Sequence, residues 1–428
     1  MENKYLAAKE ILKKHDQEHL LVNYEKLSDT EKTRLLDQIF SIDFEEVKQL
    51  YALTKKEEKF GNDVIEPIEY TNRKDIPEAK KQELIDLGIK ELKEGKYAIV
   101  TMAGGQGTRL GHNGPKGTFE VNINGEIKSI FELIFEKILV AKKLYDVEIP
   151  WYIMTSKENN NQTVAFFEKH HYFDYPKSKI TFFTQGELPM LDVNGKILLT
   201  KENEVKLAAN GHGGIFSSML DSGIIFDMKS RGIDKVYISG IDNILANLVD
   251  PLFIGFMESN KSTAAGISIV KRNPQEKVGV FCKRNGKPSV IEYTEISEEL
   301  ANKTDANGNL EFGESHVLLN MFKLEGIERI ATEKLPYHVA FKQASYINTE
   351  GKYVEGTEPN SYKFESFIFD GFEALNNMCI LRDSREEVFA PIKNSSKNNQ
   401  EDNEETARNL YINKIERNNK ELPLYENL

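Results

Sequence analysis

Apolar and polar positions alternate along this chain in blocks that predict helices and strands in turn. Residues 1–92 are polar with helical spacing, as in Ile85, Ile89 and Leu92, and Gly95 is placed to end that helix. The blocks that follow predict strands at 97–102, 151–155, 180–185 and 236–241, with helices near 129–145, 158–170 and 215–229. Strands that alternate with helices predict right-handed βαβ units, and therefore an α/β fold with a doubly wound, mostly parallel sheet.

The pattern changes at about residue 262, where strand-like segments replace this alternation. Strands are predicted at 262–270, 278–283 and 289–295, and Asn285-Gly286 is typical of a hairpin turn. A helix is expected near 362–376, and 394–408 is rich in Asn, Ser and acidic residues, which predicts a loop. These changes favour three domains: a helical amino-terminal segment 1–92, a central domain 93–345 and a smaller carboxyl-terminal domain 346–428.

The most informative segment is the glycine-rich loop that follows the first strand. It carries three glycines and two cations: Gly104, Gly105, Gly107, Arg109 and Lys116. Because glycine has no Cβ, the backbone amides of such a loop can lie directly against a phosphate. A guanidinium and an ammonium beside them suit a site where pyrophosphate charge develops. A phosphate-binding loop is predicted, and the alternative is a structural turn with solvated cations.

The spacing excludes two commoner phosphate loops. A Walker motif needs Ser or Thr directly after its lysine, whereas Lys116 is preceded by Pro115 and followed by Gly117. The dinucleotide fingerprint needs a third glycine where this chain has Leu110.

The net charge of the chain indicates which classes of binding partner to expect. The 428 residues carry a formal net charge of −12. Nucleic acid and anionic membranes need an excess of Lys and Arg on one face, so neither is an expected partner. The two cysteines, Cys282 and Cys379, give no disulfide framework and fit a reducing compartment. Without an apolar signal segment or a long apolar stretch, a cytoplasmic protein with no membrane span is expected.

Polar residues also follow the other predicted strands, at the edge where parallel sheets bind ligands. Asp242 suits a hard cation such as Mg²⁺, held jointly with substrate phosphate oxygens, and the alternative is the cap of a following helix. The Gln185 amide can donate and accept, which suits a base edge or the surface of a turn. Backbone amides around Gly211 precede a predicted helix, and the neighbouring His212 is expected to contact sugar or nucleotide rather than act as a base.

Short runs carry a resemblance that extends, in order, over about 300 residues. They are Gly104-Gly-Gln-Gly-Thr-Arg-Leu-Gly111, Trp151-Tyr-Ile-Met-Thr-Ser156, Phe183-Thr-Gln-Gly-Glu-Leu-Pro189, Gly211-His-Gly-Gly-Ile-Phe216, Asp242-Asn-Ile-Leu245, Val290-Ile-Glu-Tyr-Thr-Glu-Ile296 and Phe389-Ala-Pro-Ile-Lys-Asn394. Together they resemble the eukaryotic-type UDP-sugar pyrophosphorylases, most closely the UDP-N-acetylglucosamine members.

The resemblance implies a Rossmann-like, GT-A-like nucleotidyltransferase fold and a Mg²⁺-assisted reaction of UTP with a sugar 1-phosphate, which gives a UDP-sugar and pyrophosphate. It implies catalytic roles for Arg109, Lys116 and Lys393 and a metal-binding role for Asp242. The substrate-binding residues that it implies are Ala103, Gly104, Gly105, Gln185, Gly211, His212, Asp242, Gly279, Glu292 and Asn320. From the residues alone, Lys393 could equally be an exposed lysine, and Glu292 and Asn320 could be polar groups of the core.

The sugar and the reaction class leave alternatives open. N-acetylglucosamine-type members carry Asn where this chain has His212, which is more similar to the glucose-type and broad UDP-sugar members. N-acetylglucosamine 1-phosphate is the expected substrate, with glucose 1-phosphate as the alternative. Asp242-Asn243 also resembles a degenerate Asp-x-Asp site, so a glycosyltransferase or a nucleotide-sugar sensor remains a more remote alternative. The paired cations Arg109 and Lys116 favour the pyrophosphorylase, because neither alternative needs a pyrophosphate clamp.

Overall fold

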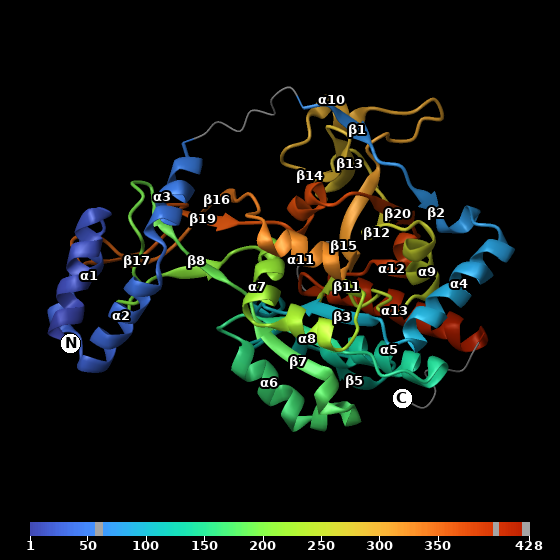
Figure 1. Cartoon of the computed structure of the whole chain (residues 1–428), viewed down its shortest axis with the longest axis horizontal. Helices are drawn as coiled ribbons and strands as arrows, with labels where there is room; N and C mark the ends of the chain where they lie inside the picture. Colours follow the sequence, from blue (N-terminus) through green and yellow to red (C-terminus); the bar gives the residue numbers. More distant parts are fainter. Residues whose placement is uncertain (56–62, 397–401, 422–428) are drawn as a thin grey trace. The chain divides into compact units, whose positions relative to one another are not determined.

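The computed structural model describes residues 1–55, 63–396 and 402–421, which form two compact units (Figure 1). The smaller unit contains the amino-terminal residues described up to Lys55 together with Gly186–Gly214 and Leu335–Phe367. The larger unit contains the other described residues. This division differs from three consecutive domains, because segments far apart in the sequence pair within the smaller unit.

An eleven-stranded sheet forms the centre of the larger unit. Its main path runs in the order β2 (Thr71–Asn72), β20 (Met378–Arg382), β12 (Ala264–Val270), β15 (Glu314–Lys323), β11 (Lys235–Gly240), β3 (Tyr97–Met102), β6 (Trp151–Thr155) and β7 (Ile180–Thr184). Only β15 runs antiparallel to its neighbours on this path. Off the path, β13 (Val280–Arg284) pairs with β15, with β14 (Lys287–Ile291) and with β1 (Ile65–Pro67). The predicted mostly parallel sheet is confirmed.

The order of the buried strands creates a switch point between β3 and β11. β3, β6 and β11 are buried along their whole length, which is typical of parallel strands covered on both faces. From β3 the chain proceeds to β6 and β7 on one side and then returns with β11 on the other side of β3 (Figure 1). The carboxyl ends of β3 and β11 therefore meet where doubly wound sheets bind their ligands.

Helices connect and flank these strands. They are α4 (Glu78–Lys93), α5 (Ile130–Tyr145), α6 (Asn160–Lys169), α7 (Ile215–Asp221), α8 (Ile224–Ser230), α9 (Pro251–Ser259), α10 (Glu298–Asn302), α11 (Leu324–Thr332), α12 (Arg385–Val388) and α13 (Glu404–Glu421), and a small hairpin of β4 (Glu120–Ile123) and β5 (Glu126–Ser129) precedes α5. Helix α5 starts at a capping box between Ser129 and Glu132. Within the described ranges, no helix is both long and apolar enough to cross a membrane.

The smaller unit packs three helices on short strands. Its elements are α1 (Glu2–Lys14), α2 (Asp29–Ser41), α3 (Phe44–Leu53), the sheet of β16 (His338–Lys342), β19 (Ser361–Glu365) and β9 (Leu191–Asp192), and the pairs of β8 (Glu187–Pro189) with β10 (Leu207–Ala209) and of β17 (Tyr346–Ile347) with β18 (Tyr353–Val354). Leu12, Leu36 and Leu50 from the helices share one core with Leu191 and Phe364 from the strands.

Four expectations about single elements need correction. The helix expected at 362–376 is wrong: Phe364 pairs with Val339 in β19, and a 3-10 helix, Ile368–Ala374, follows. The helix expected at 215–229 is two helices, because Gly223 takes a left-handed φ of 76° between them. The segment 1–92 also contains the strands β1 and β2. Of the loop expected at 394–408, residues 397–401 lie outside the described residues, and α13 already begins at Glu404.

Candidate active site

The glycine-rich loop after β3 is held by hydrogen bonds to its own backbone. Asn159 is fully buried, and its side-chain amide donates to the carbonyls of Ala103 at 3.0 Å and Gly105 at 3.3 Å. The Lys116 amide donates to the Gly105 carbonyl at 3.0 Å, so the far end of the loop folds back on its start. Asn159 was not found from the sequence, since a single Asn four residues after a strand is no recognisable motif.

Gln185 lies directly against the start of this loop. A Cβ added to Gly104 would be 3.2 Å from Gln185 Oε1, whereas Gly105 has open space at that position. Gln185 is buried, and its backbone amide donates to the Thr155 carbonyl at 2.8 Å. The structure therefore brings together the loop and the glutamine that the sequence proposed separately.

Lys116 and Asp242 meet across the switch point. Lys116 Nζ lies 3.8 Å from Asp242 Oδ2, and the two side chains are 12% and 28% exposed. Burial lowers the pKa of Lys116; the nearby Asp242 opposes this effect, and the nearby Arg109 and Lys393 add to it. Two other cations and the carboxylates of Asp242 and Asp402 thus act on Lys116, an arrangement that an anionic ligand would stabilise.

The carboxyl-terminal segment reaches this cluster by pairing with the loop after β11. The Ile392 amide donates to the Asp242 carbonyl at 2.8 Å. The side chain of Asn243 accepts from the Ala390 amide at 2.9 Å and donates to the Val388 carbonyl at 2.8 Å. These bonds place Lys393 next to the Asp242 loop, 151 residues later in the sequence.

Asp242 does not cap the next helix, as one interpretation of the sequence allowed. The next helix, α9, begins at Pro251, and Asp250 is its cap, since its carboxylate accepts from the Phe253 amide at 3.3 Å. A Cβ on Gly240 would lie 2.8 Å from Asp242 Oδ1, so the carboxylate lies over the end of β11. One partly exposed carboxylate beside a phosphate loop fits Mg²⁺, which is usually held by one or two carboxylates, water and substrate phosphates.

Lys393 is held by Asp402. Its Nζ donates to Asp402 Oδ2 at 2.9 Å, and its backbone amide donates to the Asp402 carbonyl at 2.8 Å. A cavity of about 350 Å³ lies beside this pair, lined by Phe389 and the loop 272–278. The Lys393 side chain is 41% exposed, so it remains available to a ligand.

The residues expected on the sugar side lie at or next to three strands: Gly279 directly precedes β13, Glu292 directly follows β14, and Asn320 lies on β15. A Cβ on Gly279 would be 3.2 Å from Glu292 Oε1, and the Gly279 carbonyl accepts from the His316 amide at 2.8 Å. Asn320 is fully buried, with Nδ2 3.1 Å from His316 Nε2. Its Oδ1 has no hydrogen-bond partner among the described residues. A buried amide oxygen without a donor is costly, which fits an atom that a bound ligand satisfies.

Gly211 and His212 belong to the smaller unit. Gly211 has a φ of 86°, and a Cβ there would be 2.2 Å from the Ser366 carbonyl oxygen, so only glycine fits. The His212 ring lies 5.2 Å from the Phe367 ring, centroid to centroid. Burial lowers the pKa of His212 to about 4, which leaves a neutral imidazole at pH 7.

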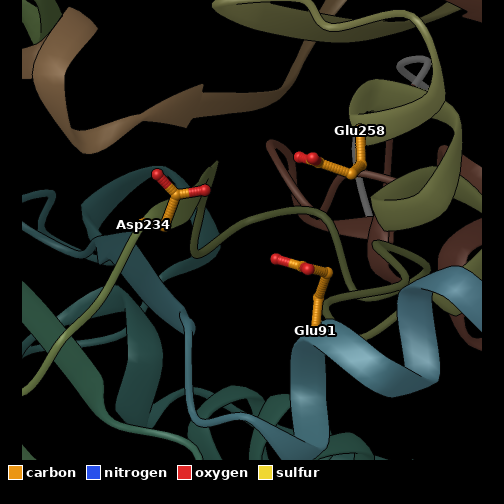
Figure 2. Close-up of side chains that lie close together, drawn as sticks. All are labelled: Glu91, Asp234 and Glu258. Carbon is orange, nitrogen blue, oxygen red and sulfur yellow. The ribbon is translucent and has the colours of Figure 1, made fainter.

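A second acidic cluster lies at the opposite end of β11. Glu91, Asp234 and Glu258 point toward one another (Figure 2). They surround the ammonium of Lys235, whose Nζ is 2.7, 2.7 and 2.9 Å from their oxygens and whose side chain is 1% exposed. Because Lys235 already lies among these carboxylates, and Lys96 and Lys323 lie 3.6 and 3.8 Å from Glu91 and Glu258, the cluster is no rival to Asp242 as a metal site.

A glycine-rich loop and a carboxylate at the switch point of a mostly parallel sheet are typical of nucleotide-binding α/β proteins of the nucleotidyltransferase type. The profile of the UTP--glucose-1-phosphate uridylyltransferase family matches residues 41–414, and the chain belongs to this family. The resemblance stated from the sequence is thereby confirmed.

Several similar proteins within this family are named for UDP-N-acetylglucosamine. The UDP-N-acetylglucosamine pyrophosphorylase of Saccharomyces cerevisiae is 36% identical over 417 residues, which cover 94% of this chain and 85% of that protein. UDP-N-acetylglucosamine diphosphorylase 2 of Arabidopsis thaliana is 33% identical, with 95% of this chain and 83% of that protein covered. The crystal structure of the uridine diphosphate N-acetylglucosamine pyrophosphorylase from Trypanosoma brucei in complex with an inhibitor is 26% identical, with a TM-score of 0.80 and coverage of 97% of this chain and 86% of that one.

Proposed function

We propose that this protein transfers the uridylyl group of UTP to N-acetylglucosamine 1-phosphate and releases pyrophosphate. The observation that carries the proposal is the meeting of Lys116, Asp242 and Lys393 at the switch point. It occurs in a chain that is 36% identical, over 417 residues, to a protein named UDP-N-acetylglucosamine pyrophosphorylase.

The reaction is an in-line displacement at phosphorus. A phosphate oxygen of the sugar 1-phosphate forms a bond to the α-phosphorus of UTP, while the bond from that phosphorus to the oxygen bridging to the β-phosphorus breaks. The electron pair leaves with pyrophosphate. No protein nucleophile is needed, because the attacking phosphate is already ionised at neutral pH. The protein contributes positioning and charge stabilisation.

The cations have separate tasks in this reaction. Arg109 and Lys116 stabilise the charge that grows on the leaving pyrophosphate, and Lys393 contacts the phosphoryl group in transfer. Asp242, together with the phosphate oxygens, would hold Mg²⁺, which when bound supplies further positive charge at those oxygens.

The remaining residues hold the two substrates. Ala103, Gly104, Gly105 and Gln185 receive the nucleotide, with the Gln185 amide at the base edge. Gly279, Glu292 and Asn320 receive the sugar, where the unsatisfied Asn320 oxygen would accept from a hydroxyl or amide. Gly211 and His212 complete the set of proposed substrate-binding residues.

We also place the protein in the cytoplasm. Cys282 and Cys379 are both free thiols, which supports a reducing compartment. The net charge of −12 supports small anionic metabolites bound by a local cationic cluster, rather than nucleic acid or membrane, as ligands.

Isotope-labelled UTP tests the reaction class. With N-acetylglucosamine 1-phosphate and Mg²⁺, label at the α-phosphorus should appear in UDP-sugar and label at the γ-phosphorus in pyrophosphate. Asp242→Asn should abolish turnover or weaken its dependence on Mg²⁺. Release of γ-label as inorganic phosphate alone would contradict the proposal, and full activity of Asp242→Asn with an unchanged Mg²⁺ requirement would remove Asp242 from the site.

A further inference from the structure

The ammonium of Lys414, on α13, connects the two segments that carry Asp242 and Lys393. Lys414 Nζ donates to the Leu245 carbonyl at 3.2 Å and to the Glu387 carbonyl at 2.5 Å. Leu245 is three residues after Asp242, and Glu387 is six residues before Lys393. One side chain therefore bonds to the backbone of both segments close to their functional residues.

A second lysine acts on the same loop. Lys137, from α5, is buried and donates to the carbonyls of Ile244 and Ala246. The carbonyls of residues 244–246 thus all accept from ammonium groups supplied by two different helices. A buried carbonyl left without a donor is costly, so these bonds help to determine the path of the loop that presents Asp242.

Burying the Lys414 ammonium costs more free energy than a purely structural contact requires. Burial lowers the pKa of Lys414, while the carboxylates of Glu387, Asp383 and Asp250 oppose this effect. Withdrawing an ammonium from water costs free energy that an apolar side chain of similar length would not cost. The ammonium supplies donors that such a side chain lacks, and these donors join the two segments.

We propose that Lys414 is a positioning residue for uridylyl transfer, whose ammonium keeps the Asp242 loop and the Lys393 segment at the spacing that the transition state requires. The inference rests on the proposed function. Misplacement of catalytic groups by about 1 Å can lower a rate by about 10²-fold, so loss of this link acts on turnover more than on nucleotide binding.

Arg417 provides a matched control on the same helix. Its guanidinium pairs with the carboxylate of Glu387 at the surface, where the two side chains are 51% and 41% exposed. Arg417→Met thus removes a cation that contacts the same residue, but leaves the carbonyls of Leu245 and Glu387 bonded to Lys414.

The test compares Lys414→Met, Lys414→Arg and Arg417→Met in the full chain. For Lys414→Met, kcat for pyrophosphate release should fall at least about tenfold, while KM for UTP changes less than about threefold. Hydrogen exchange should become faster in peptides covering 242–250 and 385–393. Arg417→Met should leave kcat and exchange close to those of the wild type.

The outcomes separate this inference from the proposed function. If the wild-type protein fails to release pyrophosphate from UTP with any sugar 1-phosphate, the proposed function fails. If the wild type is active and a folded Lys414→Met protein keeps its kcat, Lys414 has no positioning role. Should Lys414→Met not fold, Lys414→Arg decides instead: its bulkier planar head directs its N–H groups differently from an ammonium, so kcat should fall at least about threefold, and a wild-type kcat would overturn the inference.

Discussion

Lys116 lies close to several of the charged residues of the site. It lies 3.8 Å from Asp242 and within electrostatic range of Arg109 and Lys393. Without an anion, its burial and the two cations favour loss of its proton. A polyphosphate would reverse this effect, because each added negative charge favours the protonated ammonium.

Substitution of either cation at the loop should slow the chemical step. Lys116→Met and Arg109→Ala are each expected to lower kcat about 10²-fold, because both stabilise charge that grows in the transition state. Steady-state pyrophosphate release measures this, with Lys90→Met, at an exposed position of α4, as the control. Near-normal turnover in both variants would show that Arg109 and Lys116 do not stabilise the leaving pyrophosphate.

His212 is expected to influence the choice of sugar. A neutral imidazole offers one donor and one acceptor, placed differently from those of an Asn amide. His212→Asn should therefore change the ratio of kcat/KM between N-acetylglucosamine 1-phosphate and glucose 1-phosphate by about 10- to 200-fold, and change KM for UTP much less. An unchanged ratio would show that His212 does not contact the sugar.

The same variant should alter the stability of the protein in acid. The folded pKa of His212 is about 4, below the ordinary value of 6.5, so the unfolded chain binds the extra proton first. The neutral His212 side chain makes its full contribution to the free energy of unfolding above pH 6.5. This contribution is lost as the pH falls toward 4, and the loss is at most about 3 kcal/mol. Urea unfolding should show a shallower acid loss for His212→Asn than for the wild type, and parallel curves would contradict this.

At the scale of elements, helices α4 and α9 of the larger unit pack closely against each other. A Cβ on Gly88 of α4 would lie 1.9 Å from the Pro251 carbonyl oxygen, and one on Gly255 of α9 would lie 1.9 Å from that of Leu84. The two helices therefore touch backbone to backbone, which only glycine at both positions permits.

Gly88→Ala should destabilise the protein although alanine is the better helix former. The overlap with backbone should outweigh a propensity gain of about 1 kcal/mol and lower the free energy of unfolding by about 2 kcal/mol or more. Denaturant unfolding measures this difference, with Gln82→Ala, at an exposed position of the same helix, expected within about 0.5 kcal/mol of the wild type. A Gly88→Ala protein as stable as the wild type would show that α4 and α9 can move apart freely.

The elements that the sequence predicted well are those whose signal is local. β3 and β6 have the predicted bounds because each is a continuous apolar run. The helix expected at 362–376 failed because Phe364 faces Val339 in a strand pair, a contact that helical spacing cannot reveal. Tertiary pairing overrode the local pattern there.

The residues of the candidate site likewise include some with a local sequence signal and some without one. The meeting of Lys116 and Asp242 was predictable because the loops after parallel strands gather at one edge of the sheet, and the roles of both residues stay predictions. Lys393 was reached through the resemblance alone, since its place depends on the pairing of Asn243 with residues 388–390. Asn159, Lys137 and Lys414 were missed because they bind backbone carbonyls, which leaves no motif in the sequence.

At the scale of the whole molecule, the chain interleaves its two units. Gly186–Gly214 and Leu335–Phe367 join the amino-terminal helices, although the segments between them belong to the larger unit. The pairing of β9 with β19 joins residues about 170 positions apart, and no local pattern records such a contact. The larger unit by itself contains the glycine-rich loop, Asp242 and Lys393.

The proposed uridylyl transfer can be tested directly on this chain. The most direct measurement is pyrophosphate release from UTP and Mg²⁺ with a panel of sugar 1-phosphates, namely those of N-acetylglucosamine, N-acetylgalactosamine and glucose. We expect release that requires both substrates, with the highest kcat/KM for N-acetylglucosamine 1-phosphate and some turnover of the others. Turnover of glucose 1-phosphate alone, or no release with any sugar 1-phosphate, would contradict it.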